Sequence, residues 1–284
     1  MTSPETPPEL DAAALAEFTA QHGSDLPPVS VVIAAYNEER SIGATVNGIP
    51  AIVDGLETAT IVVVDGSTDR TAAEARKAGA MVCDLPVNRG QGAALRLGYR
   101  LAREGGARYI VTTDADGQYD PADIARVLAP VRRGEADFAT GSRVLGRQET
   151  HDRVRRLGVH VFAWLISRFT GQRITDTSFG LRAMRAEVTG AVTLTQPQYQ
   201  SSELLIGVIS RGFRVVEVPA TMRLRAAGTT KKGGNFVYGY RYSRVVIGTW
   251  LRERRRPVSS SSSAPARSSS EPEPVPEPEP AKTK

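Results

Sequence analysis

The sequence predicts an α/β fold, in which a mainly parallel β-sheet is covered by helices on both faces. Two observations carry this prediction. Short runs rich in β-branched residues recur along the chain, and segments compatible with helices lie between the first five of them. These runs are almost continuously apolar, as expected for strands that are buried on both faces.

Each predicted element follows from this local pattern, taken in chain order. The predicted strands are residues 29–35, 60–65, 80–84, 108–114, 137–142 and 213–218. The predicted helices between them are residues 40–49, 68–78, 92–104 and 121–133. Pro121 suits the first turn of the last helix, where its missing N–H costs no hydrogen bond. Because ligands of such sheets bind beyond the carboxyl ends of the strands, the residues that follow each strand are the functional candidates.

The composition indicates one large domain with a tail at each end. The chain has 284 residues, and its 36 Lys and Arg exceed its 31 Asp and Glu, for a net charge of +5. With 40% hydrophobic residues the chain can build a core, and residues 28–256 form the predicted domain. Residues 1–27 are rich in Pro and acidic residues, and residues 257–284 in Ser, Glu and Pro. We therefore expect both tails to be mostly disordered.

The location of the protein is predicted from what the sequence lacks. A single cysteine, Cys83, excludes a disulfide framework and a multi-cysteine zinc site. No apolar run reaches the roughly 18–20 residues of a membrane span. The first residues show no secretory signal. We therefore expect a cytoplasmic protein.

Acidic residues follow three of the predicted strands. Glu38 follows the first strand, Asp65 ends the second, and an acidic pair ends the fourth. Ser67 and Asp69 are explained equally well as caps of the next helix, and Asp65 has the same alternative. Three acidic strand ends on one edge of a sheet are nevertheless hard to explain by packing alone.

Asp114 and Asp116 are the acidic pair that ends the fourth strand. Residues i and i+2 of an extended segment point to the same side, so the two carboxylates repel one another unless a cation lies near them. Such oxygen ligands suit Mg²⁺ or Mn²⁺, which bind through one or two carboxylates together with substrate phosphates. An acidic turn with a helix cap is the simpler alternative, but the position after the apolar residues 109–111 favours a metal site.

Residues 88–92, Asn-Arg-Gly-Gln-Gly, precede a predicted helix. Glycines let a backbone approach a ligand closely, and a helix N-terminus favours anions. The segment is not a Walker loop, because it lacks Gly-Lys-Ser/Thr at the required spacing. No G-x-G-x-x-G follows the first strand either, which argues against a dinucleotide-dependent oxidoreductase.

Several longer motifs occur in a fixed order along the chain. They read VSVVIAAYNEE, VVVDGSTD, NRGQGAALRLGYRLA, TTDADGQYDP and GSR, and segments 176–182 and 212–219 continue the series. Together they resemble family 2 of the inverting nucleotide-sugar glycosyltransferases, and within it the dolichyl- or polyprenyl-phosphate sugar synthases, such as the mannose synthases. The resemblance spans about residues 28–256 and implies a GT-A type, Rossmann-like sheet.

The resemblance also implies roles for individual residues. Contacts with the nucleotide fall at Tyr36, Glu38, Val63 and Asp65. The metal and diphosphate site falls at Asp114, Ala115, Asp116 and Gln118, of which Asp114, Asp116 and Gln118 are the implied metal ligands. Further substrate contacts fall at the basic residues Arg143, Arg225 and Lys231, which suit phosphate groups.

The chain departs from the family pattern at three positions. Ala34 stands where a proline is usual, Val64 replaces the first residue of an Asp-Asp pair, and Gln91 replaces a lysine. Because Asp65 is retained, we expect nucleotide binding to survive. The departures leave open whether a GDP- or a UDP-hexose is the donor.

The activity implied is inverting transfer of a hexose from a nucleotide sugar to polyprenyl phosphate, with Mg²⁺ or Mn²⁺ as cofactor. Negative charge develops on the leaving diphosphate, so a cation at Asp116 and a guanidinium such as that of Arg143 stabilise the transition state. A lipid phosphate is largely ionised at neutral pH, because its second pKa is about 6, and needs no base. A hydroxyl acceptor needs one, and Glu203 and Asp176 are the candidates, although each also fits a structural role.

The sequence leaves two alternatives open. A glycosyltransferase of the same fold that acts on a hydroxyl of a soluble glycan or metabolite would require Glu203 as a base. A non-catalytic nucleotide-sugar binding module would not need the acidic pair, so the presence of Asp114 and Asp116 argues against it.

Residues 222–256 are strongly basic, with one acidic residue, Glu253, and with interleaved aromatic residues. This pattern fits an amphipathic segment on an anionic membrane surface, so we expect peripheral association with the cytoplasmic face of the membrane. The alternative is that its apolar side packs against the domain. Nucleic-acid binding is not expected, because the charge is local and no recognition motif appears.

Overall fold

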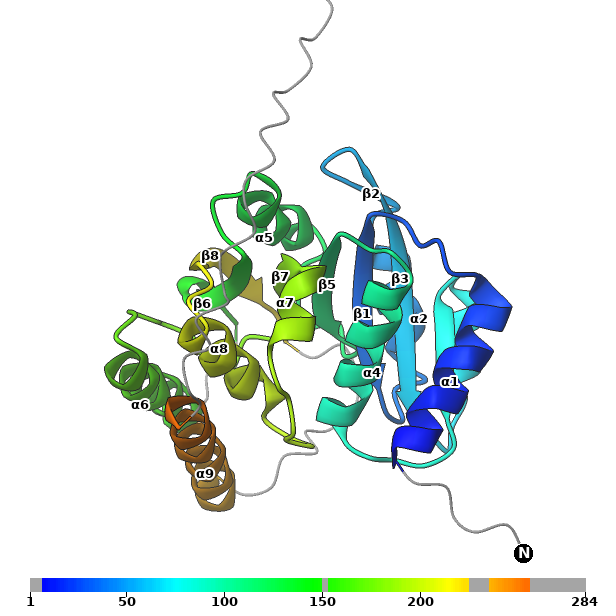
Figure 1. Ribbon diagram of the computed structural model, residues 1–284. Helices are drawn as coiled ribbons and strands as arrows, with labels where there is room; N and C mark the ends of the chain where they lie inside the picture. The colour runs from blue at the N-terminus through cyan, green and yellow to red at the C-terminus, as the bar shows by residue number, and fades with distance from the viewer. Residues whose placement is uncertain (1–6, 150–152, 225–234, 256–284) are drawn as a thin grey trace, which may run out of the picture. The chain divides into compact units, whose positions relative to one another are not determined.

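The computed structural model describes residues 7–149, 153–224 and 235–255, in which helices surround a mixed, mostly parallel sheet (Figure 1). The described strands follow the order β2-β3-β1-β5-β7-β6-β8, and β4 pairs with β3. Their bounds are Val29–Ala35 (β1), Ile52–Val53 (β2), Leu56–Asp65 (β3), Met81–Leu85 (β4), Tyr109–Asp114 (β5), Phe138–Gln148 (β6), Arg182–Arg185 (β7) and Val215–Met222 (β8). Parallel pairing joins β1 with β3 and β5, β3 with β4, and β6 with β8.

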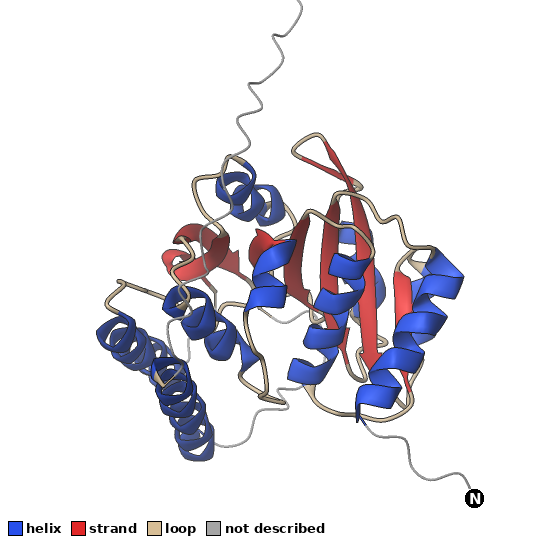
Figure 2. Cartoon of the chain, in the orientation of Figure 1, coloured by secondary structure: helices blue, strands red, loops and turns tan. Residues whose placement is uncertain are grey.

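Helices cover both faces of the sheet, as the sequence predicts (Figure 2). Their bounds are Pro7–His22 (α1), Ile42–Gly48 (α2), Thr71–Lys77 (α3), Gln91–Glu104 (α4), Asp123–Arg132 (α5), Arg153–Thr170 (α6), Ala186–Ala191 (α7), Gln200–Ser210 (α8) and Asn235–Arg254 (α9). Successive residues of β3 point to opposite faces. Val63 therefore packs in one core cluster with α1, α4, α7 and α8, whereas Val62 packs in the other with α2, α3 and α5.

Strand β7 was not predicted, and it runs antiparallel to both of its neighbours, β5 and β6. It has only four residues and includes two arginines, so it carries no apolar run that a sequence pattern could show. Its position between two longer strands supplies the backbone partners that hold it in the sheet. All six predicted strands are present, and β6 and β8 extend several residues beyond their predicted ends.

Helix α1 contradicts the expectation that residues 1–27 are mostly disordered. Phe18 and Leu26 are 3% and 5% exposed and belong to the core cluster of α4 and β4. Asp11 forms an ion pair of 2.6 Å with Arg89. The composition of the segment was misleading, because its few apolar residues pack against α4 and β4 of the domain and become buried there. The tail 257–284 lies outside the described residues.

Helices α6 and α9 pack beside α8 around a separate apolar cluster of Ile166, Ile206, Tyr242 and Val246. The ring of Trp250 stacks on Phe169 with centroids 4.5 Å apart, and its Nε1 donates to the Phe169 carbonyl. One side of the basic and aromatic segment therefore packs on the domain, as the alternative interpretation held. In the described part of the chain, no helix combines the length and apolar character that a membrane span requires.

Candidate active site

The candidate site lies at the carboxyl ends of β3, β1 and β5, which are neighbours in the sheet. Ala34 of β1 is in register with Val63 on one side and with Asp114 on the other. Because these strands are parallel, the loops that follow them leave the sheet at the same edge. The structure thus brings together the acidic strand ends that the sequence singled out.

The loops after β1 and β3 are joined by reciprocal hydrogen bonds. The carboxylate of Asp69 accepts the backbone N–H groups of Thr71 at 3.0 Å and Glu39 at 3.2 Å, and Ser67 Oγ accepts that of Asn37 at 3.0 Å. Partial burial alone would raise the pKa of Asp69, but these bonds and that from the Thr71 hydroxyl outweigh it and lower the pKa. Asp69 therefore accepts the N–H of Thr71, the first residue of α3, in line with the suggested capping role, whereas Ser67 bonds to the loop after β1 and does not cap the helix.

Tyr36 and Glu38 lie in the loop after β1. The Tyr36 side chain is 37% exposed, so its ring is accessible at the edge. The backbone N–H of Glu38 donates to Thr71 Oγ1 at 2.8 Å, and its carboxylate accepts Ser41 Oγ at 3.0 Å. Glu38 is therefore held by the segments around it, and Tyr36 is exposed in the same loop, at the sheet edge.

Asp65 is 2% exposed and holds the loop 88–92. Its two carboxylate oxygens accept the backbone N–H groups of Arg89 at 2.9 Å and Gly90 at 2.7 Å. The side chain of Val63 is fully buried in the core, so the structure contradicts a direct substrate contact by that side chain. The contribution of Asp65 is to fix the loop that borders the edge.

The glycines of the loop 88–92 permit close packing of another segment. A Cβ on Gly92 would lie 2.0 Å from the Gln196 carbonyl oxygen, and one on Gly90, whose φ is +92°, would lie 2.7 Å from that of Pro197. The Gly92 N–H donates to the Pro197 carbonyl at 2.8 Å. The sequence suggested that these glycines let the backbone approach a ligand; in the structure it is the protein's own loop before α8 that lies against them. Gln91 between them donates from Nε2 to Asp114 Oδ1 at 3.3 Å.

The acidic pair stands at and just beyond the end of β5. Asp116 is 5% exposed, and its Oδ1 accepts the Gln118 N–H at 3.1 Å. Ala115 is buried, and its carbonyl accepts the Thr45 hydroxyl at 3.2 Å. Asp114 is half-buried and has no salt bridge with a described residue.

The carboxylate oxygens of this pair suit a hard divalent cation whose remaining ligands come from the substrate. Within the described ranges no group of three His, Cys, Asp or Glu side chains could hold a metal. Two carboxylates suffice for Mg²⁺ or Mn²⁺ when substrate phosphates complete the coordination. Gln118 donates from Nε2 to the Arg223 carbonyl at 3.2 Å, and its Oε1 is the atom that could bind a cation.

A cavity of about 190 Å³ adjoins Asp114 and is also lined by Thr45, Tyr119 and Arg223. The Tyr119 hydroxyl accepts the Gly180 N–H at 2.8 Å. Burial raises the pKa of Tyr119 well above its ordinary value, so the phenol stays neutral. A Cβ on Gly180 would lie 2.8 Å from Asp114 Oδ2, which explains why the chain needs a glycine beside the acidic pair.

Arg143 lies in β6 in a buried ion pair with Asp176. Their side chains are 4% and 0% exposed, and Arg143 Nε donates to Asp176 Oδ2 at 2.6 Å. Arg143 Nη2 also donates to Ser178 Oγ at 3.1 Å. Both side chains are thus buried and bonded to one another, an arrangement that fits a structural role better than the predicted direct role of Arg143 or the base role of Asp176. The pair instead fixes the segment that leads to Gly180.

Glu203 is fully buried in α8 and is surrounded by donors. Its carboxylate accepts the N–H groups of Thr195 and Gln196 at 2.9–3.0 Å and the Thr195 hydroxyl at 2.9 Å. It also forms an ion pair of 2.9 Å with Arg252 of α9. These bonds contradict the predicted base role and assign Glu203 to holding the 195–196 loop and α9 in place.

Arg225 and Lys231 lie outside the described residues. The chain that precedes them is tied to the site, since the Arg223 N–H donates to the Gln118 carbonyl at 2.8 Å and Arg223 pairs with Asp120. Sequence reasoning missed Arg223, Gly180 and the contact of Gln91 with Asp114. Of these, only Gly180 could have been found from the sequence, because it lies in the motif of residues 176–182.

The mostly parallel sheet with its acidic edge fits a glycosyltransferase of the GT-A fold, as the sequence predicted. Residues 30–192 match the family described as Glycosyl transferase family 2. This match covers more than half of the chain, and the protein belongs to that family.

Named relatives agree with this assignment. The chain is 36% identical to a dolichyl-phosphate hexose transferase of Haloferax volcanii, over 80% of this chain and 96% of that one. It is 33% identical to a polyprenol monophosphomannose synthase of Mycolicibacterium smegmatis, over 72% of this chain and 81% of that one. The fold is similar to that of glucosyl-3-phosphoglycerate synthase from Mycobacterium tuberculosis, solved with Mn²⁺, UDP and glucosyl-3-phosphoglycerate. That likeness has a TM-score of 0.64 and 25% identity, over 91% of this chain and 88% of that one.

Proposed function

We propose that the protein transfers a hexose from a nucleotide sugar to polyprenyl phosphate, with inversion at the anomeric carbon. The observation that carries the proposal is the acidic pair Asp114 and Asp116 at the edge of a family 2 domain whose 36% identical relative is named a dolichyl-phosphate hexose transferase. A metal-free binding module would have no need of two carboxylates at this place.

The donor side of the site follows from the same edge. Tyr36 and Glu38, in the loop after β1, would meet the base and ribose, and Asp65 holds the loop 88–92 through two hydrogen bonds. Asp114 and Asp116 would hold Mg²⁺ or Mn²⁺, in agreement with the Mn²⁺ and UDP bound to the similar synthase. When bound, the cation offsets the negative charge that develops on the leaving diphosphate.

The fixed carboxylates favour a phosphate acceptor over a hydroxyl acceptor. Glu203 and Asp176, the two candidate bases, are both fully buried and paired with arginines. A phosphate monoester with a second pKa of about 6 is already a nucleophile at neutral pH. It requires orientation rather than deprotonation. The similarity to a synthase solved with glucosyl-3-phosphoglycerate keeps a soluble acceptor as the second candidate.

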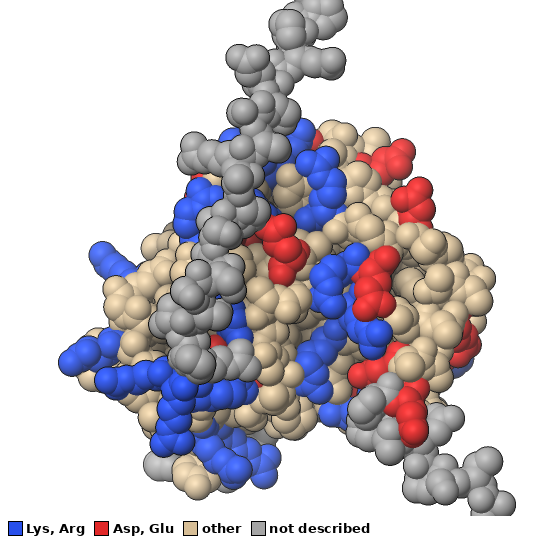
Figure 3. All heavy atoms as spheres, viewed as in Figure 1, with Lys and Arg blue, Asp and Glu red and all other residues tan. Residues whose placement is uncertain are grey.

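We also propose that α6 and α9 rest on an anionic membrane surface. Leu157, Val161 and Trp164 of α6 are 65%, 50% and 68% exposed, and their spacing of four and three residues places them on one side of the helix. Ile247 and Leu251 of α9 are 41% and 38% exposed. Lys and Arg side chains gather over these two helices at the lower left of Figure 3. Apolar residues flanked by basic ones suit the interface of an anionic bilayer.

The transfer proposal is tested with polyprenyl phosphate, Mg²⁺ or Mn²⁺, and a panel of radiolabelled GDP- and UDP-hexoses. Label that enters the organic phase with one donor, and is lost in Asp116→Ala, supports the proposal and identifies the sugar. Metal-dependent hydrolysis of a donor without labelled lipid would refute the lipid acceptor.

The membrane proposal is tested by vesicle flotation. Trp164→Ser should weaken binding to anionic vesicles, whereas Ile52→Ser, at a 63% exposed residue of β2, should not.

A further inference from the structure

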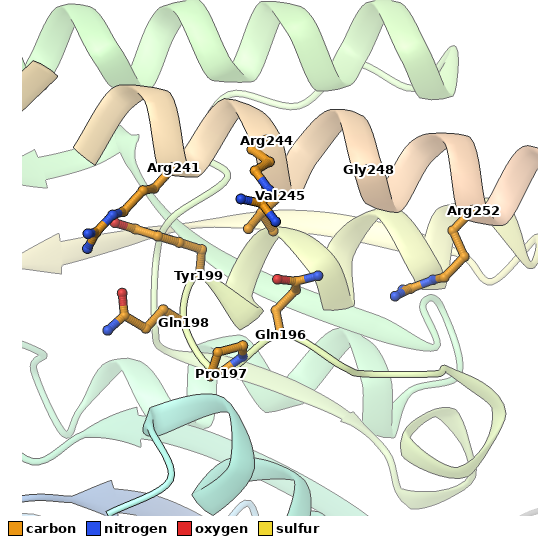
Figure 4. A pocket seen from close by; sticks show the side chains of 9 residues that line it. All are labelled: Gln196, Pro197, Gln198, Tyr199, Arg241, Arg244, Val245, Gly248 and Arg252. Carbon is orange, nitrogen blue, oxygen red and sulfur yellow. The ribbon is translucent and has the colours of Figure 1, made fainter. Parts of the chain in front are cut away.

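A second cavity, which we call the arginine pocket, lies between α9 and the loop 196–199 (Figure 4). Its volume is about 520 Å³, and no acidic residue is among the described residues that line it. The residues that shape it are Tyr199, Arg241, Arg244, Val245, Gly248 and Arg252. In Figure 4 the three arginine side chains extend from α9 toward the loop. Their spacing of three or four residues, or multiples of it, places them on one side of the helix.

The arginines differ in what they contact. Arg252 is held by the buried Glu203 at 2.9 Å and by Glu253 at 3.2 Å, and it forms a fixed wall at one end. Arg241 and Arg244 have no hydrogen bond or ion pair with any described residue. Two uncompensated guanidinium groups that face a cavity without carboxylates favour an anionic ligand, and guanidinium matches phosphate in geometry.

The loop that forms the other wall is held under strain. Tyr199 has a φ of +59°, a left-handed conformation that is unfavourable for a tyrosine, and its ring meets that of Tyr242 edge-on at 5.5 Å. Strain of this kind persists where surrounding contacts impose it, and it is concentrated at functional sites. The Tyr199 ring and Val245 also give the pocket an apolar portion beside its charges.

The arginine pocket is connected to the candidate active site through a single loop. Pro197, which lines the pocket, accepts the Gly92 N–H at 2.8 Å, and the adjacent Gln91 donates to Asp114 at 3.3 Å. The loop 196–199 therefore borders the arginine pocket on one side and contacts, on the other, the segment whose Gln91 reaches Asp114.

We propose that the arginine pocket binds the phosphate monoester of the acceptor, with Arg241 and Arg244 as its charged partners and with Tyr199 and Val245 against the first apolar part of its chain. This inference rests on the proposed lipid-phosphate acceptor. It adds the place where the acceptor docks and the two residues that recognise it.

The test measures ligand binding by calorimetry in the absence of any donor, with farnesyl phosphate as a short-chain probe. The double variant Arg241→Gln/Arg244→Gln should weaken binding by about tenfold or more, since it removes both charge-assisted contacts. Gly248→Leu should block the pocket, because a Cβ at Gly248 meets no atom within 4 Å and the side chain can enter the cavity. Farnesol should bind far more weakly than farnesyl phosphate.

Matched controls separate the pocket from general effects of charge and bulk on α9. Arg254→Gln removes a charge whose guanidinium lies over Trp250, outside the pocket. Gly239→Leu adds the same bulk at a position where a Cβ also meets no atom within 4 Å. Gly239 lies on the opposite side of α9 from Gly248, because nine residues correspond to about two and a half helical turns. Both should bind farnesyl phosphate as the wild type does, and thermal melts should show that all variants are folded.

Several outcomes would overturn the inference. Unchanged affinity in the pocket variants, or no binding of farnesyl phosphate by the wild type, would remove the pocket as the acceptor site. Inorganic phosphate that competes as well as farnesyl phosphate would make it a site for free phosphate. If the pocket variants lose affinity for vesicles of anionic phospholipid to the same extent as for farnesyl phosphate, the pocket is part of the membrane-binding surface and not an acceptor site. If the wild type transfers sugar to polyprenyl phosphate and the pocket variants keep its KM, the proposed function stands and only this inference fails.

Discussion

The replacement Glu203→Gln distinguishes a structural carboxylate from a catalytic base. Glu203 is fully buried and accepts hydrogen bonds from two backbone N–H groups, one hydroxyl and Arg252. An amide keeps the shape but turns one oxygen into a donor, so a buried N–H loses its acceptor, which costs about 1–3 kcal/mol. The ion pair with Arg252, whose side chain is 26% exposed, is also weakened, by about 1 kcal/mol.

These contributions sum to about 3 kcal/mol, which for a domain of this size lowers the Tm by about 6–12 °C. The assay combines thermal unfolding with the rate of sugar transfer, measured well below the Tm of the variant. We expect kcat to stay within about threefold of the wild type, whereas loss of a general base would lower it by about 10²–10⁴-fold. An unchanged Tm with a large loss of kcat would refute the structural assignment. Glu187→Gln, at an exposed residue of α7, is the control and should leave both quantities unchanged.

Three further predictions concern packing and protonation. Asp176→Asn leaves the buried Arg143 without its counter-charge, so urea unfolding should show a loss of about 3–5 kcal/mol, and a loss below 1 kcal/mol would contradict the pairing. Gly92→Ala should lower the Tm although alanine favours helices, because its Cβ would meet the Gln196 carbonyl at 2.0 Å; an increased Tm would show that the loop is placed differently. Burial raises the pKa of Cys83 to about 12, so its thiol stays protonated at pH 8 and should react with a thiol reagent only after unfolding; rapid reaction of the folded protein would contradict this.

The sequence predicted the frame of the fold because apolar runs buried on both faces are a strong local signal. It did not predict β7, whose four residues include Arg182 and Arg185 and depend on neighbouring strands for their pairing. It also underestimated α1, since the burial of Phe18 depends on a surface formed by distant residues. Such tertiary contacts leave no periodic pattern in the segment itself.

The same limit applies to the site. The acidic strand ends were predictable, because the topology of a parallel sheet brings them to one edge. The partners of charged side chains were not, since Asp176 and Glu203 resemble free carboxylates until Arg143 and Arg252 are seen beside them. The glycines of 88–92 likewise required the structure, which shows that a loop about 100 residues later in the chain packs against them.

The most direct test of the central claim compares polyprenyl phosphate and polyprenol as acceptors for the same labelled donor and the same metal, across pH 5 to 9. The account predicts that only the phosphate takes up label, with a rate that rises through the second pKa of the acceptor at about 6 and then levels off, because no side chain has to remove a proton. Transfer to polyprenol or to a soluble hydroxyl acceptor, at a rate equal to or above that with the phosphate, would contradict it.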